Sequence, residues 1–298
     1  MTSLQIIVFI IATAFLVLGG LVSNGFIATL IITEWSKCRR LNSSELLLLS
    51  LGVSNVFITV FLPGYFAVHI FSIVTIRHLV GHMLMGGTLF AGLCRYTFTA
   101  WLCVFYCVKI LNSTQSFFLW WKLRISWLIP RLIVGTVIFS LLVSLALLNL
   151  LPDYHPGHIA SSVTNVTHEE MLELNSLYFL SFVAFTGCPL VVVLLSSILV
   201  VASLCSHVCQ MTSNESCLKN PQTQAHTKAA GTVVSLLFLY VSFYVGNILI
   251  HPEVLTETVR IFAALMMMVY SPAQAAILVF VNPKLKQAAS RMLLKKKH

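Results

Sequence analysis

The sequence predicts an all-α membrane protein that crosses the bilayer as a bundle of seven helices. Two observations of composition support this, a hydrophobic content of 58% and a charged content of only 9%. A soluble domain usually carries about 25% charged residues, so this chain has too few polar groups to cover a surface in water. The third observation is a series of seven apolar segments, each long enough for a bilayer crossing, which needs about 20 residues.

The seven predicted spans follow one another along the chain with short connections. They cover residues 6–32, 46–71, 80–110, 125–148, 177–204, 229–250 and 259–281, and residues 282–298 form a tail. The third span is longer than one crossing requires, so we expect it to be tilted. The chain shows no internal repeat and no soluble region, and residues 1–298 are therefore interpreted as a single domain.

The distribution of charges predicts the orientation of the chain. With the N-terminus outside, the inner segments carry most of the 18 lysines and arginines, and the outer segments carry most of the nine acids. Because cytoplasmic loops are rich in lysine and arginine, we expect an outer N-terminus and a cytoplasmic C-terminus. The tail alternates apolar and basic residues, which is typical of a short amphipathic helix on the membrane surface. This orientation also exposes Asn165, in an Asn-Val-Thr sequence, to glycosylation.

The composition excludes several classes of function. The net charge of +9 does not indicate nucleic-acid binding, because the basic residues lie in short segments between apolar runs. The eight cysteines form no CxxC pair, and no spacing of histidine, cysteine or acidic residues predicts a metal site or another cofactor. The spans hold almost no acids and no catalytic set, so an enzyme is not expected. A transporter or channel stays open as an alternative, although the usual inverted repeats are missing.

Short motifs in order along the chain resemble the type 2 (bitter) taste receptors, a family of G-protein-coupled receptors. The first span contains SNGFI from Ser23, and the third ends in FYCVKI, Phe105 to Ile110. AHTKAA from Ala225 leads into the sixth span, and NPKLK from Asn282 opens the tail. The resemblance implies a cell-membrane receptor that binds small, often bitter molecules and activates a heterotrimeric G protein of the gustducin type.

A vomeronasal type 1-like receptor remains an alternative within the same class. The Ser271-Pro272 sequence in the seventh span is similar to one of its motifs, whereas Lys109 and the tail motif favour the taste family. The final KKKH matches a dilysine retrieval pattern, which would hold part of the receptor in the endoplasmic reticulum. The sequence leaves open whether two receptors associate as a dimer.

One residue breaks the apolar pattern of the third span. Helical spacing places Arg95 on one face with Thr88, Gly92, Thr99 and Tyr106. An isolated charge that faces lipid is costly, so this face is predicted to point into the bundle.

The resemblance suggests what Arg95 does there. The family usually carries an arginine in the second span, where this chain has Asn55. We expect Arg95 to replace it from the third span and to form an interhelical network by donating hydrogen bonds to Asn55 and Asn24, and to exposed carbonyls or water. A direct ligand contact at the floor of the pocket is the alternative.

The remaining expectations concern the two ends of the bundle. The family often has tryptophan and asparagine at the positions of Thr88 and Gly92, so the pocket of this chain should be wider and less aromatic there. The expected ligand-binding residues of the outer half are Thr88, Gly92, Arg95, Phe182, Phe185, Tyr244, Asn247, Ala264 and Met268. The expected G-protein-coupling residues of the inner face are Tyr106, Lys109, His207, His226 and Lys228. The alternative interpretation of the first set is packing between helices. The alternative for the second set is contact with lipid headgroups.

Overall fold

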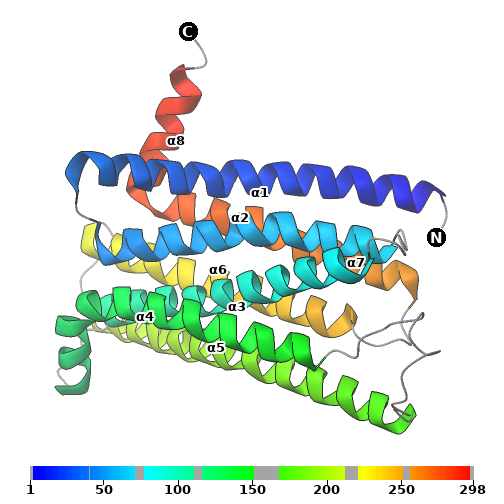
Figure 1. The fold of residues 1–298 in the computed structure, drawn as a ribbon. Helices are drawn as coiled ribbons and strands as arrows, with labels where there is room; N and C mark the ends of the chain where they lie inside the picture. The colour runs from blue at the N-terminus through cyan, green and yellow to red at the C-terminus, as the bar shows by residue number, and fades with distance from the viewer. Residues whose placement is uncertain are drawn as a thin grey trace.

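A computed structural model describes residues 3–39, 41–70, 77–110, 116–150, 168–211, 221–250 and 256–295, and every regular element within these ranges is an α-helix. Figure 1 shows the helices as one elongated bundle. The helices are α1 (Ser3–Cys38), α2 (Ser43–Ile70), α3 (Arg77–Ile110), α4 (Ser116–Asn149), α5 (His168–Met211), α6 (Pro221–Ile250), α7 (Glu257–Val281) and α8 (Pro283–Lys295).

Seven of the described helices, α1 to α7, are long and apolar enough to cross a bilayer. Each contains one predicted span, apart from residue 71, which lies outside the described residues. The fold class predicted from composition and span length is therefore confirmed. Helices satisfy their own backbone hydrogen bonds, which hydrocarbon cannot do, and this requirement explains why the crossing segments are helical throughout.

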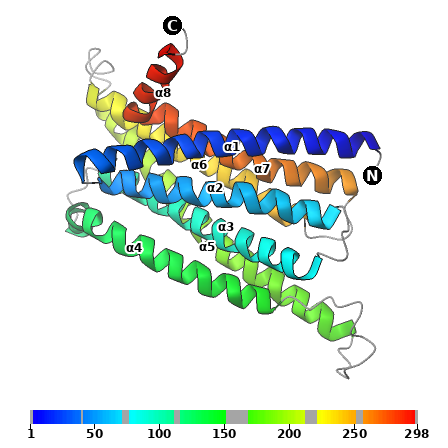
Figure 2. The same cartoon turned by 45° about the horizontal axis from the view of Figure 1, so that its top comes forward.

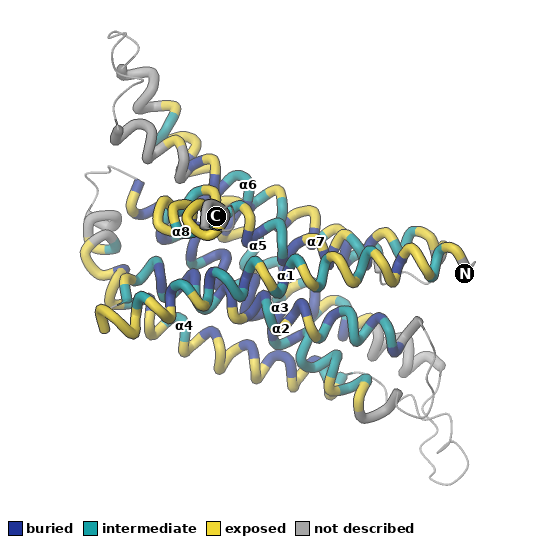
Figure 3. Tube along the Cα trace, turned by 90° about the horizontal axis from the view of Figure 1, so that it is seen from above, coloured by how far each residue is buried: buried dark blue, intermediate teal, exposed yellow. Residues whose placement is uncertain are grey.

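The third helix lies at the centre of the bundle. In the apolar stretch of α3 that qualifies it as a membrane span, 72% of the residues are buried, against 11% in that of α1. The helix α3 contacts α2, α4, α5 and α6. Figure 3 shows the buried positions gathered on the inward faces and the exposed positions on the outside. The exposed positions include large apolar side chains such as Phe15, Phe238 and Phe280. Such residues face lipid, so a central position on α3 is the most sheltered site in this molecule.

Small residues let α3 approach its neighbours closely, as is common between helices in membranes. A Cβ atom added at Gly87 would lie 2.9 Å from ring atoms of Phe61 on α2. A Cβ at Gly86 would lie 2.8 Å from Leu148 on α4. These two glycines set the spacing of three helices at the end of α3 that is nearer its N-terminus.

The short helix α8 leaves the bundle at a steep angle to α7 (Figures 1 and 2). The Oδ1 atom of Asn282 accepts a hydrogen bond from the backbone N–H of Lys284 at 3.0 Å. The Lys284 Nζ atom donates to Glu45 of α2 at 2.6 Å, and this bond raises the pKa of Lys284. Leu285 is buried while most of the polar residues of α8 are exposed. The amphipathic helix expected in the tail is thus present and tied to the bundle.

The close approach at Gly87 gives a first prediction. Gly87→Ala should lower the free energy of unfolding by about 1–3 kcal/mol, because the added methyl group overlaps the Phe61 ring. Gly135→Ala on α4 is the matched control, since no atom lies within 4 Å of its added Cβ. The measurement is thermal unfolding in lipid nanodiscs. Equal stability of the two variants would show that the α2–α3 contact is not tight.

Candidate functional site

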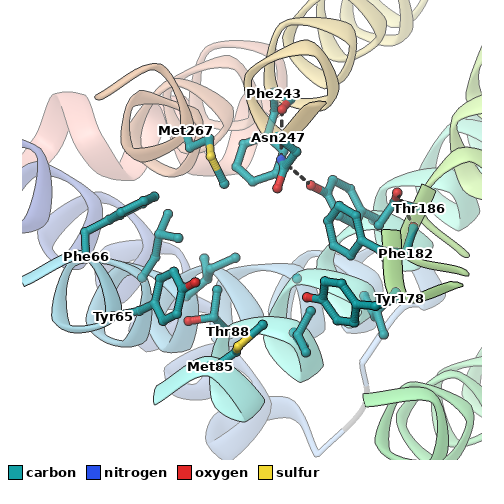
Figure 4. Close-up of a pocket in the computed structure, with 16 residues that line it drawn as sticks. Tyr65, Phe66, Met85, Thr88, Tyr178, Phe182, Thr186, Phe243, Asn247 and Met267 are labelled. Atoms are coloured by element: carbon teal, nitrogen blue, oxygen red, sulfur yellow. Dashed lines mark hydrogen bonds between the residues drawn. The ribbon is translucent and has the colours of Figure 1, made fainter. Parts of the chain in front are cut away.

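A cavity of about 90 Å³ opens among α2, α3, α5, α6 and α7 (Figure 4). Its lining combines apolar and aromatic side chains with a few polar groups. The lining residues are Ile58, Leu62, Tyr65, Phe66, Met85, Thr88, Leu89, Gly92, Leu93, Tyr96, Tyr178, Phe182, Thr186, Phe243, Asn247 and Met267.

The central helix supplies the floor and one wall of this cavity. Met85, Thr88, Gly92 and Tyr96 recur at steps of three or four residues, so they fall on one face of α3. Gly92 is the position where the wall lacks a side chain, and an added Cβ would make an ordinary contact of 3.6 Å with Ile58.

The chemistry of the cavity is uncharged and aromatic. Tyr178 and Phe182 of α5 lie with their rings stacked, 6.4 Å between centroids. Across the cavity, the Asn247 amide donates to the Tyr96 hydroxyl at 3.3 Å and to the backbone carbonyl of Phe243 at 2.9 Å (Figure 4). Apolar walls with a few placed polar groups are typical of sites for small organic molecules.

The structure brings together four of the residues expected in the pocket. Thr88, Gly92, Phe182 and Asn247 all line the cavity. Two others, Arg95 and Met268, line a smaller cavity of about 10 Å³ deeper in the bundle. The two cavities share three lining residues, which are Ile58, Leu62 and Met267.

The other three expected pocket residues do not line the large cavity, and their contact with a ligand stays a prediction. The Phe185 ring packs edge-on against Phe139 of α4, with centroids 6.0 Å apart. The Tyr244 hydroxyl points to the backbone carbonyl of Val183, 3.5 Å away on α5. Ala264 is buried among core residues. These side chains instead serve the contacts between helices.

The sequence analysis missed several aromatic residues of the cavity. Tyr96 and Phe243 line it and also pack on each other, with ring centroids 5.4 Å apart. Met267 lines it in place of Ala264. Tyr96 lies one position after Arg95, so helical spacing from Gly92 by four residues was a signal that could have found it.

A buried polar network joins α1, α2, α3 and α7 below the cavity. The Asn55 amide donates to Asn24 at 3.0 Å and to Gln274 at 2.9 Å. The Gln274 amide in turn donates to Thr99 at 3.0 Å and to the Tyr270 hydroxyl at 3.2 Å. Gln274 is completely buried, and the sequence analysis did not predict its place in this network.

The helix that carries Gln274 is held to α1 in the same layer. The Asn24 amide donates to the Ser271 backbone carbonyl at 3.2 Å and to its hydroxyl at 3.1 Å. The hydroxyls of Ser271 and Thr59 share a hydrogen bond of 2.7 Å. Ser271 precedes Pro272, whose ring leaves one backbone bond of α7 unmade. The side chains of α1 and α2 therefore bind α7 next to its proline.

The predicted hydrogen bonds from Arg95 to Asn55 and Asn24 are wrong. Both Asn55 amide protons go to Asn24 and Gln274, and the three side-chain nitrogens of Arg95 have no hydrogen-bond partner among the described residues. The guanidinium lies instead over the rings of Phe243 and Tyr270, 4.2 Å from each centroid. The side chain extends toward α6 and α7, where aromatic faces attract a cation, and not toward α2.

Two of the residues expected to couple to a G protein are described with their side chains. Tyr106 is partly buried against α5 and α6, and Lys109 is exposed with its ammonium 4.6 Å from the Phe105 ring centroid. His207 lies in α5, and His226 and Lys228 lie in α6, but their side chains are outside the described part. Asn165 falls outside the described residues altogether. Within the described ranges, no cluster of metal-ligating side chains is found.

Comparison with known proteins decides the family. The sequence profile of the family described as Taste receptor protein (TAS2R) matches residues 1–297 of the chain. The chain belongs to this taste receptor family. Similar curated proteins include taste receptor type 2 member 8 of Papio hamadryas, 29% identical with 92% of this chain and 91% of the relative covered. Member 41 of Pan troglodytes is 29% identical, with 96% and 95% covered, and member 40 of Gallus gallus is 28% identical, with 92% and 90% covered.

As a member of this family, the chain is a bitter taste receptor of the G-protein-coupled class, a multi-pass membrane protein and not an enzyme. The prediction made from its motifs is confirmed at this level. These relatives are taste receptors, and they do not favour the vomeronasal and transporter alternatives.

The polar network of this taste receptor gives a second prediction. Thr99→Val and Gln274→Leu should each lower the free energy of unfolding by about 1–3 kcal/mol, because each leaves a buried partner unpaired. The double variant should lose less free energy of unfolding than the two single variants together, and the difference, the coupling free energy, should be about 0.5–2 kcal/mol. Thr97→Val is the matched control, since Thr97 bonds only within its own helix in the structure, to Leu93. Thermal unfolding of the four combinations measures the cycle, and additive effects of Thr99 and Gln274 would contradict the network.

Proposed function

We propose that this receptor resides in the cell membrane, binds compact bitter molecules in the cavity of about 90 Å³, and activates a gustducin-type G protein at its other end. The observation that carries the proposal is the uncharged aromatic lining, in which Asn247 and Tyr96 are two of the polar side chains. Such a lining favours molecules with an apolar body and a hydrogen-bonding group.

The size of the cavity limits the ligand in this conformation. Sites for drug-sized molecules usually measure roughly 300–1,000 Å³, so a cavity of about 90 Å³ admits a small ligand only. A larger agonist requires side chains of the wall to move. Phe66 and Met85, at the edges of the view in Figure 4, are long side chains that rotate without a change of backbone.

A connected set of aromatic contacts links the ligand cavity to the helices of the inner half, so that binding can affect them. Tyr96 packs on Tyr240, with centroids 4.8 Å apart, and the Tyr240 hydroxyl donates to the Thr186 carbonyl of α5 at 2.9 Å. Phe243 packs on Tyr270 of α7 at 5.1 Å. A ligand that displaces Tyr96 or Phe243 therefore acts on α5, α6 and α7 together, and movement of packed helices is a common means of signalling.

The inner face offers a surface for the G protein. Lys109 is exposed at the end of α3, and Tyr106 lies one turn before it. An open hollow of about 320 Å³ lies where the first part of α6 meets the end of α7 and the start of α8, with Ser235, Pro283 and Lys286 among its lining residues. We assign G-protein contact to this end, together with His207, His226 and Lys228 on α5 and α6.

The cavity gives a third prediction. Gly92→Leu should lower agonist potency by at least about 10-fold, because its side chain would fill the cavity. Gly135→Leu is the matched control on α4, where the space around the added Cβ is open. Calcium release is measured in cells that co-express a gustducin-type G protein, with an agonist found by screening bitter compounds. Equal potency of the two variants at equal surface amounts would place the ligand elsewhere.

The orientation gives a fourth prediction, which rests on positive charges at the inner helix ends such as Lys37, Arg124 and Lys284. A peptide tag before Met1 should bind antibody on intact cells, whereas a tag after His298 should bind only after the membrane is permeabilised. The reverse pattern would overturn an outer N-terminus. The first tag also measures the surface delivery of the cavity variants.

Retention through KKKH would appear as a pool of receptor inside the cell. The substitutions Lys295→Ala and Lys296→Ala should make this pool smaller.

A further inference from the structure

The most unusual group in the described part of the molecule is the guanidinium of Arg95. The residue is completely buried, and its Nε, Nη1 and Nη2 atoms have no hydrogen-bond partner in the structure. A guanidinium stays charged at every physiological pH. Burial of such a charge without a partner costs several kcal/mol, so the site needs a compensating group.

The aromatic rings compensate only part of this charge. Phe243 and Tyr270 lie 4.2 Å from the guanidinium carbon and Tyr96 lies 5.4 Å away, each measured to the ring centroid. Rings attract the cation through their faces but accept no strong hydrogen bond from its N–H groups. The described acids nearest the inner membrane surface, Glu34 and Glu45, are both bound to Lys284. Among the described residues, the guanidinium of Arg95 therefore makes no hydrogen bond within the distance and angle limits and no salt bridge to an acid.

A small cavity lies against this arginine. It measures about 10 Å³, the lower limit for one water molecule, and most of its lining is apolar. A chloride ion or a carboxylate is larger and enters only when the lining side chains move apart. Arg95 lines it with Thr59 and Ser271, whose hydroxyls bond each other at 2.7 Å. Through Ile58 and Met267 it adjoins the ligand cavity, so the path from the ligand to Arg95 is one layer of side chains thick.

We propose that Arg95 binds a small monovalent anionic group at the floor of the ligand cavity. The group is either a chloride ion or the carboxylate of an acidic agonist, since both place negative charge and hydrogen-bond acceptors at the guanidinium edge. A water molecule that bridges Arg95 to the unpaired Oδ1 of Asn55 is the competing occupant. Water would accept hydrogen bonds from the guanidinium but would not neutralise its charge. An anion accepts the hydrogen bonds and also neutralises the charge. The carboxylate source rests on the proposed function, and the chloride source does not.

The test measures thermal unfolding of the purified full-length receptor in uncharged lipid nanodiscs. Sodium gluconate is replaced by sodium chloride at constant ionic strength, and in separate samples sodium benzoate is compared with benzamide in gluconate. Arg95→Met removes the charge and keeps a long side chain. Arg131→Met is the matched control, because Arg131 is also a cation over a ring, 3.2 Å from the centroid of Trp127, but lies exposed on α4.

A chloride site predicts that the melting temperature of the wild type and of Arg131→Met rises by roughly 3–6 °C and saturates, while Arg95→Met does not respond. A carboxylate site predicts the same pattern for benzoate, with no effect of benzamide or chloride. The absence of any anion effect, or an equal effect in Arg95→Met, overturns the proposal in favour of water. This readout does not use signalling, so its failure leaves the proposed function standing.

If Arg95→Met does not fold, crystals of the wild type grown in bromide decide the question. An anomalous peak within hydrogen-bond reach of the guanidinium supports the free ion. Crystals grown in bromide together with benzoate should lose this peak if the carboxylate displaces the ion. A bromide crystal without a peak at Arg95, combined with no benzoate effect on unfolding, overturns the proposal.

Discussion

The structure depends on the placement of one permanent positive charge in the middle of a bundle that faces hydrocarbon. A bilayer offers no water to a buried polar group, so the protein itself must supply acceptors and opposing charge. Arg95 lies on α3, the most buried of the crossing helices, and three rings from α3, α6 and α7 surround its guanidinium. The packing of α6 and α7 against α3 is therefore also the solvation of this charge.

The asparagine and glutamine side chains form a second layer beside that charge. Asn24, Asn55 and Gln274 pair with one another and with Thr99, so α1, α2, α3 and α7 share one hydrogen-bond network. Amide groups both donate and accept, and a chain of them can close on itself without an ion. This explains how α2 keeps its contact with α7 although it carries Asn55 where the family resemblance predicts arginine.

The sequence was sufficient for the fold because a membrane span is a one-dimensional signal. About 20 apolar residues in a row identify a crossing helix whatever its neighbours are, and all seven spans lie in helices. The inward face of α3 was predictable for a similar reason, since a charge at Arg95 cannot face lipid. The candidate site was harder, because adjacent residues on a helix differ by about 100° in direction. Met267 lines both cavities whereas Met268 lines only the smaller one, and a pattern of three methionines does not distinguish them.

The partner of Arg95 was unpredictable from the sequence for a different reason. Spacing defines the face of a helix but not the direction of a long side chain, and Arg95 reaches α6 and α7 where proximity to α2 had suggested Asn55. The consequence concerns function directly. Phe243 and Tyr96 each belong both to the ligand cavity and to the group of rings around the guanidinium. A ligand that moves either ring changes the stabilisation of a buried charge, by about 0.5–2 kcal/mol for each cation–π contact. Coupling free energies of 1–3 kcal/mol are typical of allosteric proteins, so the contacts of Arg95 alone are strong enough to bias α6 and α7 between two arrangements.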